Sequence, residues 1–133
     1  MASRLVWWVL LRYPVSQVLS HFRHHVARNG FAGGLVEFCR NPAFQNIQSK
    51  YLSGVALTKF IFVGILELIQ FDIITLSDLV GSKLPLLHLN RIDVLPSIPV
   101  TRKQIAMIES YNSDDMALYA AAIAHRCRTT STS

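Results

Sequence analysis

The chain has 133 residues, of which 51% are hydrophobic and 16% charged, and this composition excludes a disordered or collagen-like protein. A chain of this length forms one domain with a hydrophobic core of its own. It carries 13 lysines and arginines against 8 acidic residues, a formal net charge of +5, and no acid precedes Glu37. This positive first quarter favours an anionic partner such as a phosphate, a nucleic acid or an acidic lipid surface, although arginines on a solvated face give the same pattern.

Cysteine usage and hydropathy favour a soluble chain in a reducing compartment. Cys39 and Cys127 stand far apart, which favours free thiols over a disulfide framework or a zinc site. The apolar run at residues 5–11 is too short to span a bilayer, and no signal-peptide cleavage site follows it. The apolar tract at residues 55–76 contains three charged residues, which a membrane span disfavours. We therefore expect no signal peptide or transmembrane segment, and a cytoplasmic location by default.

The first predicted elements are a strand, a tight turn and a helix. Residues 5–11 form a continuous apolar run, typical of a strand buried on both faces of a parallel sheet. Pro14 stands where a helix begins, because its missing N–H costs nothing at the first helical position. Apolar residues then recur at helical spacing until Asn29 and Gly30 end the pattern.

The rest of the chain alternates predicted helices with one more strand. In chain order these are a helix over 35–40, a helix over 43–52, a buried strand over 60–64, a helix over 66–81 and two helices after residue 100. Thr101 and Gln104 have the spacing of a capping box for the first of the last two helices. Asp114 and Asp115 lie in the first turn of the second, where carboxylates favour the helix dipole. We take residues 1–128 as one domain and 129–133 as a disordered tail.

The predicted strand, turn and helix at the start also carry the most informative chemistry. Arg12 ends the strand beside a helix N-terminus, where a guanidinium and free backbone N–H groups can bind an anion. Ser20 follows eight residues later, about two turns into the helix and within reach of the same anion. An ordinary strand-end arginine and an ordinary helix serine are the alternative interpretation.

Four segments of the chain follow the order of a known family pattern. They are RYPVSQVLSHF at 12–22, NIQSKYLSG at 46–54, FVGILE at 62–67 and NSDDMALY at 112–119. These segments resemble RDPVERVLSHY, NLQTRYLAG, FVGITE and the closing N..D..LY helix of sulfotransferases that use 3′-phosphoadenosine 5′-phosphosulfate. The resemblance extends over about residues 5–125 and is closest to Golgi-type and related bacterial carbohydrate sulfotransferases.

The resemblance implies a fold, a reaction and a binding site. The fold would be α/β, a partial P-loop-kinase-like sulfotransferase fold with a short parallel sheet and a mostly helical C-terminal part. The reaction would transfer a sulfuryl group from 3′-phosphoadenosine 5′-phosphosulfate to a hydroxyl acceptor, a carbohydrate in the nearest members. Arg12 and Ser20 would bind the 3′-phosphate of this donor, no metal would take part, and no catalytic residue is assigned. A longer eukaryotic enzyme of this kind would lie in the Golgi lumen.

Departures from the family pattern bear on activity. Tyr13 replaces the usual aspartate, and Lys50 replaces an arginine. The family's lysine- and glycine-containing loop and its usual base come before the segment at 12–22, and the first eleven residues match neither. We therefore expect impaired or absent activity in this short chain. The alternative is a non-catalytic remnant or interaction module that pairs with another protein through exposed apolar surface.

Lys50 and Glu67 each have two interpretations. Lys50 either contacts the donor or is a solvated helix lysine, and the second is simpler. Glu67 either orients a ligand or compensates the dipole at a helix start, and again the second is simpler.

The histidines and the tryptophan pair are expected to be structural. His21 and His25 share a helix face, but no third ligand lies nearby, so we expect no metal. His24 is a candidate surrogate base. Trp7 and Trp8 are interpreted as core residues rather than a stacking surface, and no specific nucleic-acid binding is expected.

Overall fold

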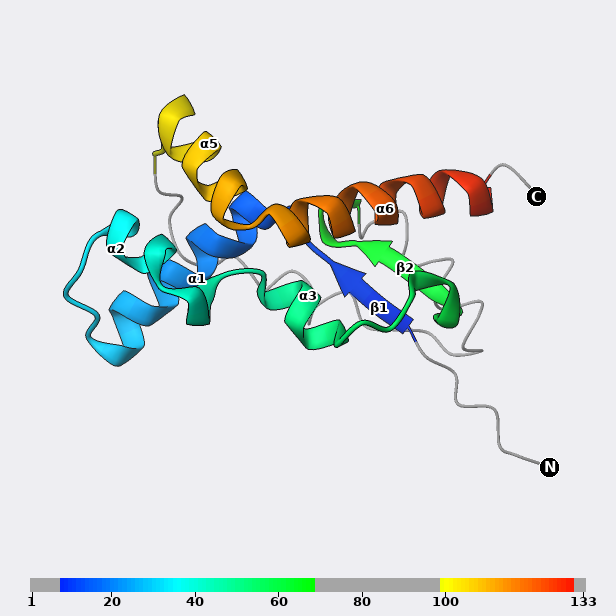
Figure 1. Cartoon of the computed structure of the whole chain (residues 1–133), viewed down its shortest axis with the longest axis horizontal. Coiled ribbons are helices and arrows are strands. Elements are labelled where there is room, and N and C mark those ends of the chain that lie inside the picture. Colours follow the sequence, from blue (N-terminus) through cyan, green and yellow to red (C-terminus); the bar gives the residue numbers. More distant parts are fainter. Residues whose placement is uncertain (1–7, 69–98, 131–133) are drawn as a thin grey trace.

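The computed structural model describes residues 8–68 and 99–130 of the chain. In chain order its elements are β1 (Trp8–Leu11), α1 (Pro14–Asn29), α2 (Leu35–Arg40), α3 (Ile47–Leu52), β2 (Phe62–Ile65), α5 (Arg102–Tyr111) and α6 (Ser113–Thr130), with 3₁₀ turns at Pro42–Phe44, Leu57–Lys59 and Leu66–Leu68 (Figure 1). The architecture is mixed α/β and mostly helical, with a short parallel pair of strands. No helix in this part of the chain is long and apolar enough to cross a membrane.

The two strands pair in parallel, as their continuous apolar runs predict. Trp8 lies opposite Phe62 and Leu11 opposite Ile65. All residues of β2 are buried, and Gly64 is required there because a Cβ at this position would lie 2.7 Å from the Phe62 ring. The second strand begins later than the predicted 60–64, since Phe60 ends the preceding 3₁₀ turn by donating its N–H to the Leu57 carbonyl.

Helix α1 begins and ends where the sequence predicts. Pro14 occupies its first turn, and Gly30 ends it in the left-handed conformation with φ 65°. Positive φ is nearly free of strain for glycine alone, which is why this residue ends the helix sharply. The predicted helix over 35–40 is likewise confirmed as α2.

The helix predicted over 43–52 is wrong. The segment is instead a 3₁₀ turn at Pro42–Phe44, a break and then α3, which is only six residues long. Asn46 causes the break with a φ of 51°, a conformation outside the helical region. Its backbone N–H donates to Asn112 Oδ1 at 2.9 Å, so a contact from far along the chain stabilises the interruption.

The C-terminal helices follow their start signals. Thr101 and Gln104 form the predicted capping box, with each side chain accepting a hydrogen bond from the other residue's backbone N–H. Helix α6 runs to Thr130, which lies inside the stretch 129–133 that the sequence assigns to a tail. Of the helix predicted over 66–81, only the 3₁₀ turn at Leu66–Leu68 lies within the described residues.

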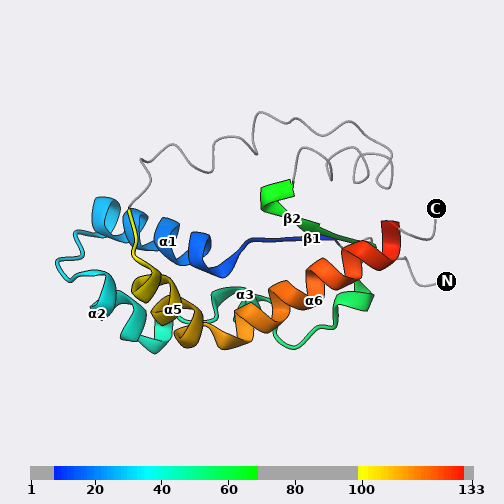
Figure 2. The ribbon, with the colours of Figure 1, turned by 90° about the horizontal axis from the view of Figure 1, so that it is seen from above.

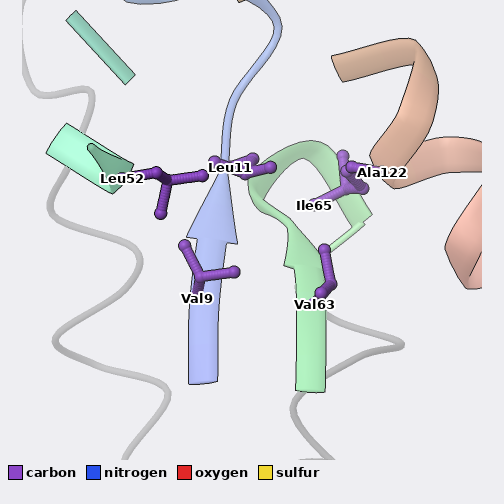
Figure 3. Close-up of a cluster of buried hydrophobic side chains, with 6 residues drawn as sticks. All are labelled: Val9, Leu11, Leu52, Val63, Ile65 and Ala122. Atoms are coloured by element: carbon purple, nitrogen blue, oxygen red, sulfur yellow. The ribbon is translucent and has the colours of Figure 1, made fainter. Parts of the chain in front are cut away.

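One hydrophobic cluster fixes the sheet against α3 and α6, which lie on the same side of it (Figure 2). Strand side chains that point to this face meet one residue from each helix (Figure 3). The buried members are Val9, Leu11, Val63, Ile65, Leu52 and Ala122. Because α6 covers β2 and α3 sits beside β1, the two helices hold the ends of the strands in place.

A second hydrophobic cluster lies between α1, α2 and α5, beyond the carboxyl ends of the strands (Figure 1). Its buried members are Val15, Val18, Phe38, Cys39 and Ile108. Burial raises the pKa of the Cys39 thiol, so this cysteine stays protonated and behaves as a small apolar residue. This cluster orients α1 as it leaves β1.

Candidate functional site

The candidate site lies where both parallel strands end. Arg12 and Tyr13 follow β1, and Glu67 follows β2 at the same edge of the sheet. The Glu67 carboxylate accepts a hydrogen bond from the backbone N–H of Tyr13, which directly joins the segments that follow the two strands. In open α/β sheets, ligands bind at the carboxyl ends of the strands, so this edge is the natural place for a site.

The start of α1 gives this edge a partial positive charge. Tyr13 is the N-cap without a side-chain hydrogen bond, Pro14 has no N–H, and the first turn contains no acid of its own. Helix geometry leaves the N–H groups of Val15 and Ser16 without a partner inside the helix. Together with the helix dipole, these groups favour an anion at this end of α1.

Glu67 already contributes one negative charge to the start of α1. The sequence predicts that it compensates the dipole of the helix that begins beside it. Glu67 does lie in the first turn of the 3₁₀ helix at Leu66–Leu68, the described part of that predicted helix, and its carboxylate also reaches the N-cap of α1, 54 residues earlier in the chain. A carboxylate there stabilises α1 and also repels a second anion, so a ligand phosphate would have to displace or adjust it.

The backbone of Arg12 is held by Gln48 of α3. The N–H of Arg12 donates to Gln48 Oε1 at 2.8 Å, and Gln48 Nε2 donates to the Arg12 carbonyl at 2.8 Å. Sequence reasoning missed Gln48. Its only signal was its place inside the NIQSKYLSG segment, and no periodicity pairs residue 48 with residue 12.

Asp115 anchors the start of α3. The residue is 2% exposed, and its carboxylate accepts hydrogen bonds from the N–H of Gln48 at 3.2 Å, the N–H of Ser49 at 2.7 Å and the Ser49 hydroxyl at 2.7 Å. The sequence places Asp115 in the first turn of its own helix, which is where it lies. Its side chain, however, caps another helix.

Two asparagines complete the connection between the C-terminal helices and α3. Asn46 accepts a hydrogen bond from the N–H of Asp115 at 3.0 Å, while Asn112 accepts one from the N–H of Asn46. Asn112 is itself 2% exposed and donates to the Ile108 carbonyl at 2.8 Å. A continuous series of polar contacts therefore runs from the junction of α5 and α6 to Arg12.

Ser20 is less accessible than the sequence suggests. It lies on the buried face of α1 and is 7% exposed. The helical rise puts it about 9 Å along the axis from Pro14. Arg12 is half-buried, whereas the Ser20 hydroxyl has little surface to offer a phosphate.

Two tyrosines border the site. The rings of Tyr13 and Tyr119 are 5.6 Å apart and tilted. Burial raises the pKa of both phenols, helped by Glu109 at Tyr13 and by Glu67 and Tyr13 at Tyr119. Both phenols are therefore protonated at neutral pH, and a neutral phenol donates hydrogen bonds to anions rather than acting as a base.

The remaining sequence candidates have structural partners. Lys50 Nζ donates to the Pro42 carbonyl at 2.6 Å, so this exposed lysine ties α3 to the preceding turn. His21 and His25 pack edge-on, with ring centroids 5.9 Å apart. Burial lowers the pKa of His21, and His25 and His24 lower it further. No group of three or more histidines, cysteines or acids within residues 8–68 and 99–130 could hold a metal ion.

Trp8 corrects another prediction, because it is 48% exposed rather than part of the core. It borders an open hollow of about 410 Å³ along β1, together with Ile47, Gln48 and the 84% exposed Tyr51 of α3. Val9 and Leu11, which alternate with Trp8 along β1, are the residues of this strand that join the hydrophobic cluster with α3 and α6, and Trp8 is not among its members. Trp7 lies outside the described residues.

Comparison of the chain with protein-family models, with curated proteins and with solved structures finds no match. The function is therefore argued from the residues of the site.

Proposed function

We propose that this chain is a sulfotransferase-like protein whose carboxyl edge binds the 3′-phosphate end of a nucleotide sulfate donor, 3′-phosphoadenosine 5′-phosphosulfate. The observation that carries the proposal is the position of Arg12, which follows a parallel strand and precedes the start of α1, whose N-cap Tyr13 makes no side-chain cap hydrogen bond. The resemblance of residues 12–22 to the 3′-phosphate segment of that family supplies the identity of the anion. A partial P-loop-kinase-like sulfotransferase fold is part of the proposal.

The groups at the edge suit a phosphate dianion. A guanidinium binds phosphate through two parallel hydrogen bonds, and first-turn N–H groups of a helix add further donors. Glu67 weakens binding by repulsion, and the burial of Ser20 limits its contribution. Arg12 is therefore the main determinant of binding in this proposal, with Ser20 secondary.

The chemical step needs more than these residues provide. When bound, the donor supplies a sulfuryl group that passes to an acceptor hydroxyl, and transfer of this kind requires positive charge on the reacting oxygens and in-line geometry. In the family that the chain resembles, those groups lie in a lysine- and glycine-containing loop that this sequence does not match. The described residues of the site therefore support donor binding, and the proposal assigns them no role in the transfer of the sulfuryl group to a carbohydrate acceptor.

Calorimetric titration with adenosine 3′,5′-bisphosphate tests the proposal. Arg12→Ala should weaken binding by about 10- to 100-fold, since hydrogen bonds between charged groups contribute about 1.5–3 kcal/mol. Arg28→Ala is the matched control, because Arg28 is an exposed arginine in the last turn of the same helix. Equal binding by wild type and a folded Arg12→Ala variant would exclude Arg12 as the phosphate ligand. Failure of the wild type to bind would exclude the function.

A second candidate function is a non-catalytic interaction module that pairs with another protein. The hollow beside β1 favours it, because exposed Trp8 and Tyr51 border a strand edge there. Every second residue of a strand directs its backbone N–H and C=O to the same edge. The backbone groups of Leu10 therefore point to the edge at which Gln48 bonds the backbone of Arg12. The simplest occupant is β1 of a second copy. Sedimentation velocity should then detect a dimer that Trp8→Ser abolishes, and a monomer at all concentrations would contradict it.

A further inference from the structure

The backbone of Arg12 is bonded by the side chain of Gln48. Its N–H and its carbonyl both bond the Gln48 amide, each at 2.8 Å, and Glu67 bonds the next N–H, that of Tyr13. The amide donates and accepts at the same time, as a neighbouring strand would, and so continues the pairing of β1 past its last residue. Two hydrogen bonds to one planar group fix both the position and the orientation of the peptide.

Gln48 is held in its turn by the start of α3. Its backbone N–H donates to Asp115, whose carboxylate also binds both the N–H and the hydroxyl of Ser49. Since α3 is only six residues long, this cap and the contact between Asn46 and Asn112 set where the helix begins. The amide of Gln48 therefore starts from a fixed backbone rather than a freely moving loop.

We propose that Gln48 is a positioning residue of the anion site. By fixing the peptide of Arg12, it directs the guanidinium toward a phosphate on the 3′ side of the ribose and so gives the site its preference for 3′-phosphorylated nucleotides. This inference rests on the proposed function and extends it to selectivity. Gln48 acts through Arg12 and need not touch the ligand.

Only a glutamine-like group can make both contacts. Methionine has a similar shape but neither donates nor accepts a comparable hydrogen bond. Glutamate keeps the acceptor for the Arg12 N–H but turns a carboxylate oxygen toward the Arg12 carbonyl, where two acceptors repel. Protonation of that carboxyl group restores a donor, and the adjacent carbonyl raises its pKa above the usual value of about 4.3.

The test compares affinities for adenosine 3′,5′-bisphosphate and adenosine 5′-monophosphate. Gln48→Met should lower the preference for the bisphosphate about tenfold, the equivalent of one hydrogen bond, while leaving affinity for the monophosphate unchanged. Gln48→Glu should show the same loss of preference for the bisphosphate at neutral pH. As the pH falls, its preference should return toward that of wild type measured at the same pH. Gln45→Met is the matched control, because Gln45 Nε2 also bonds a backbone carbonyl, that of Cys39 at 2.8 Å, away from Arg12.

Each outcome decides the inference. A folded Gln48→Met variant with wild-type preference would overturn it, as would an equal loss of affinity for both nucleotides, which indicates a merely structural role. Should Gln48→Met fail to fold, Gln48→Glu decides. A preference for the bisphosphate that returns at low pH supports the inference, and a preference that does not return overturns it. If the wild type binds neither nucleotide, the proposed function fails. Hydrogen exchange then tests the two hydrogen bonds between Gln48 and the Arg12 backbone by themselves. Faster exchange of the Arg12 amide in Gln48→Met than in wild type supports them, and equal exchange overturns the inference.

Discussion

The region of the sheet and the region of α1, α2 and α5 are stabilised by different interactions. Around the sheet, side-chain hydrogen bonds join α3 to residues 66 to 69 positions away at the start of α6. Around α2, aromatic rings pack against one another instead, and Phe38 stacks on Phe44 with ring centroids 4.3 Å apart. Directional bonds fix the candidate site, while non-directional packing fixes the helix that leaves it.

This difference has a physical consequence for substitutions. Buried polar networks require each partner, because a donor left unpaired loses its hydrogen bond to water as well. Apolar clusters are sensitive to volume, since a lost ring leaves a cavity. The two regions should therefore respond to different kinds of change, and the following variants test the comparison in order of expected effect.

The largest loss of stability is expected for Phe38→Ala. Phe38 is fully buried and its ring meets those of His21, Phe22 and Phe44. Removing it should lower the free energy of unfolding by about 3–5 kcal/mol, measured by urea denaturation. Val36→Ala on the same helix is the control and should cost less than about 1 kcal/mol, because Val36 is 37% exposed. Similar losses in both variants would contradict the role of the aromatic cluster.

A smaller loss is expected for Asp115→Ala, which removes a buried acceptor from Gln48 and Ser49. The free energy of unfolding should fall by about 2 kcal/mol, and hydrogen exchange in α3 should accelerate before the rest of the chain unfolds. Asp114→Ala is the matched control, since Asp114 is an exposed neighbour in the same first turn. Equal effects would mean that helix-dipole compensation, not the cap on α3, explains Asp115.

The smallest expected effect is a dependence of stability on pH that arises from His21 in the aromatic region. The pKa of His21 is lowered from 6.5 by burial first, then by His25 and His24. The unfolded chain therefore binds a proton below pH 6.5 that the folded chain resists, so this contribution to stability is complete above that pH and is lost as the pH falls. Midpoints of thermal unfolding measured across this range should fall less steeply with acid in His21→Gln. An unchanged slope would assign the acid dependence to other groups.

The sequence predicted the parts of the fold that depend on near neighbours. Pro14 and Gly30 mark the ends of α1 because each acts on its own backbone, and the capping box at Thr101 closes within three residues. The short apolar runs predicted both strands, since a buried parallel pair needs no alternation. The position of Arg12 directly after the first strand was predicted for the same reason, because it is a charged residue at the end of such a run.

The parts that the sequence did not predict depend on distant partners. Asn46 interrupts a helical pattern because Asn112 receives its N–H, and Gln48 gains its role from a backbone 36 residues away. Trp8 looks like a core residue by composition and is half exposed, because Val9 and Leu11, not Trp8, are the β1 residues that join the cluster with α3 and α6. Single-chain periodicity carries no information about such pairings.

The cap on α3 has a consequence for synthesis. Arg12 and Gln48 emerge from the ribosome before Asp115, whose carboxylate fixes the start of α3. During translation, residues 12 and 48 therefore lack this cap until synthesis has passed residue 115. A nascent chain arrested before residue 115 would carry every residue of the proposed anion site and still lack the one that sets its geometry.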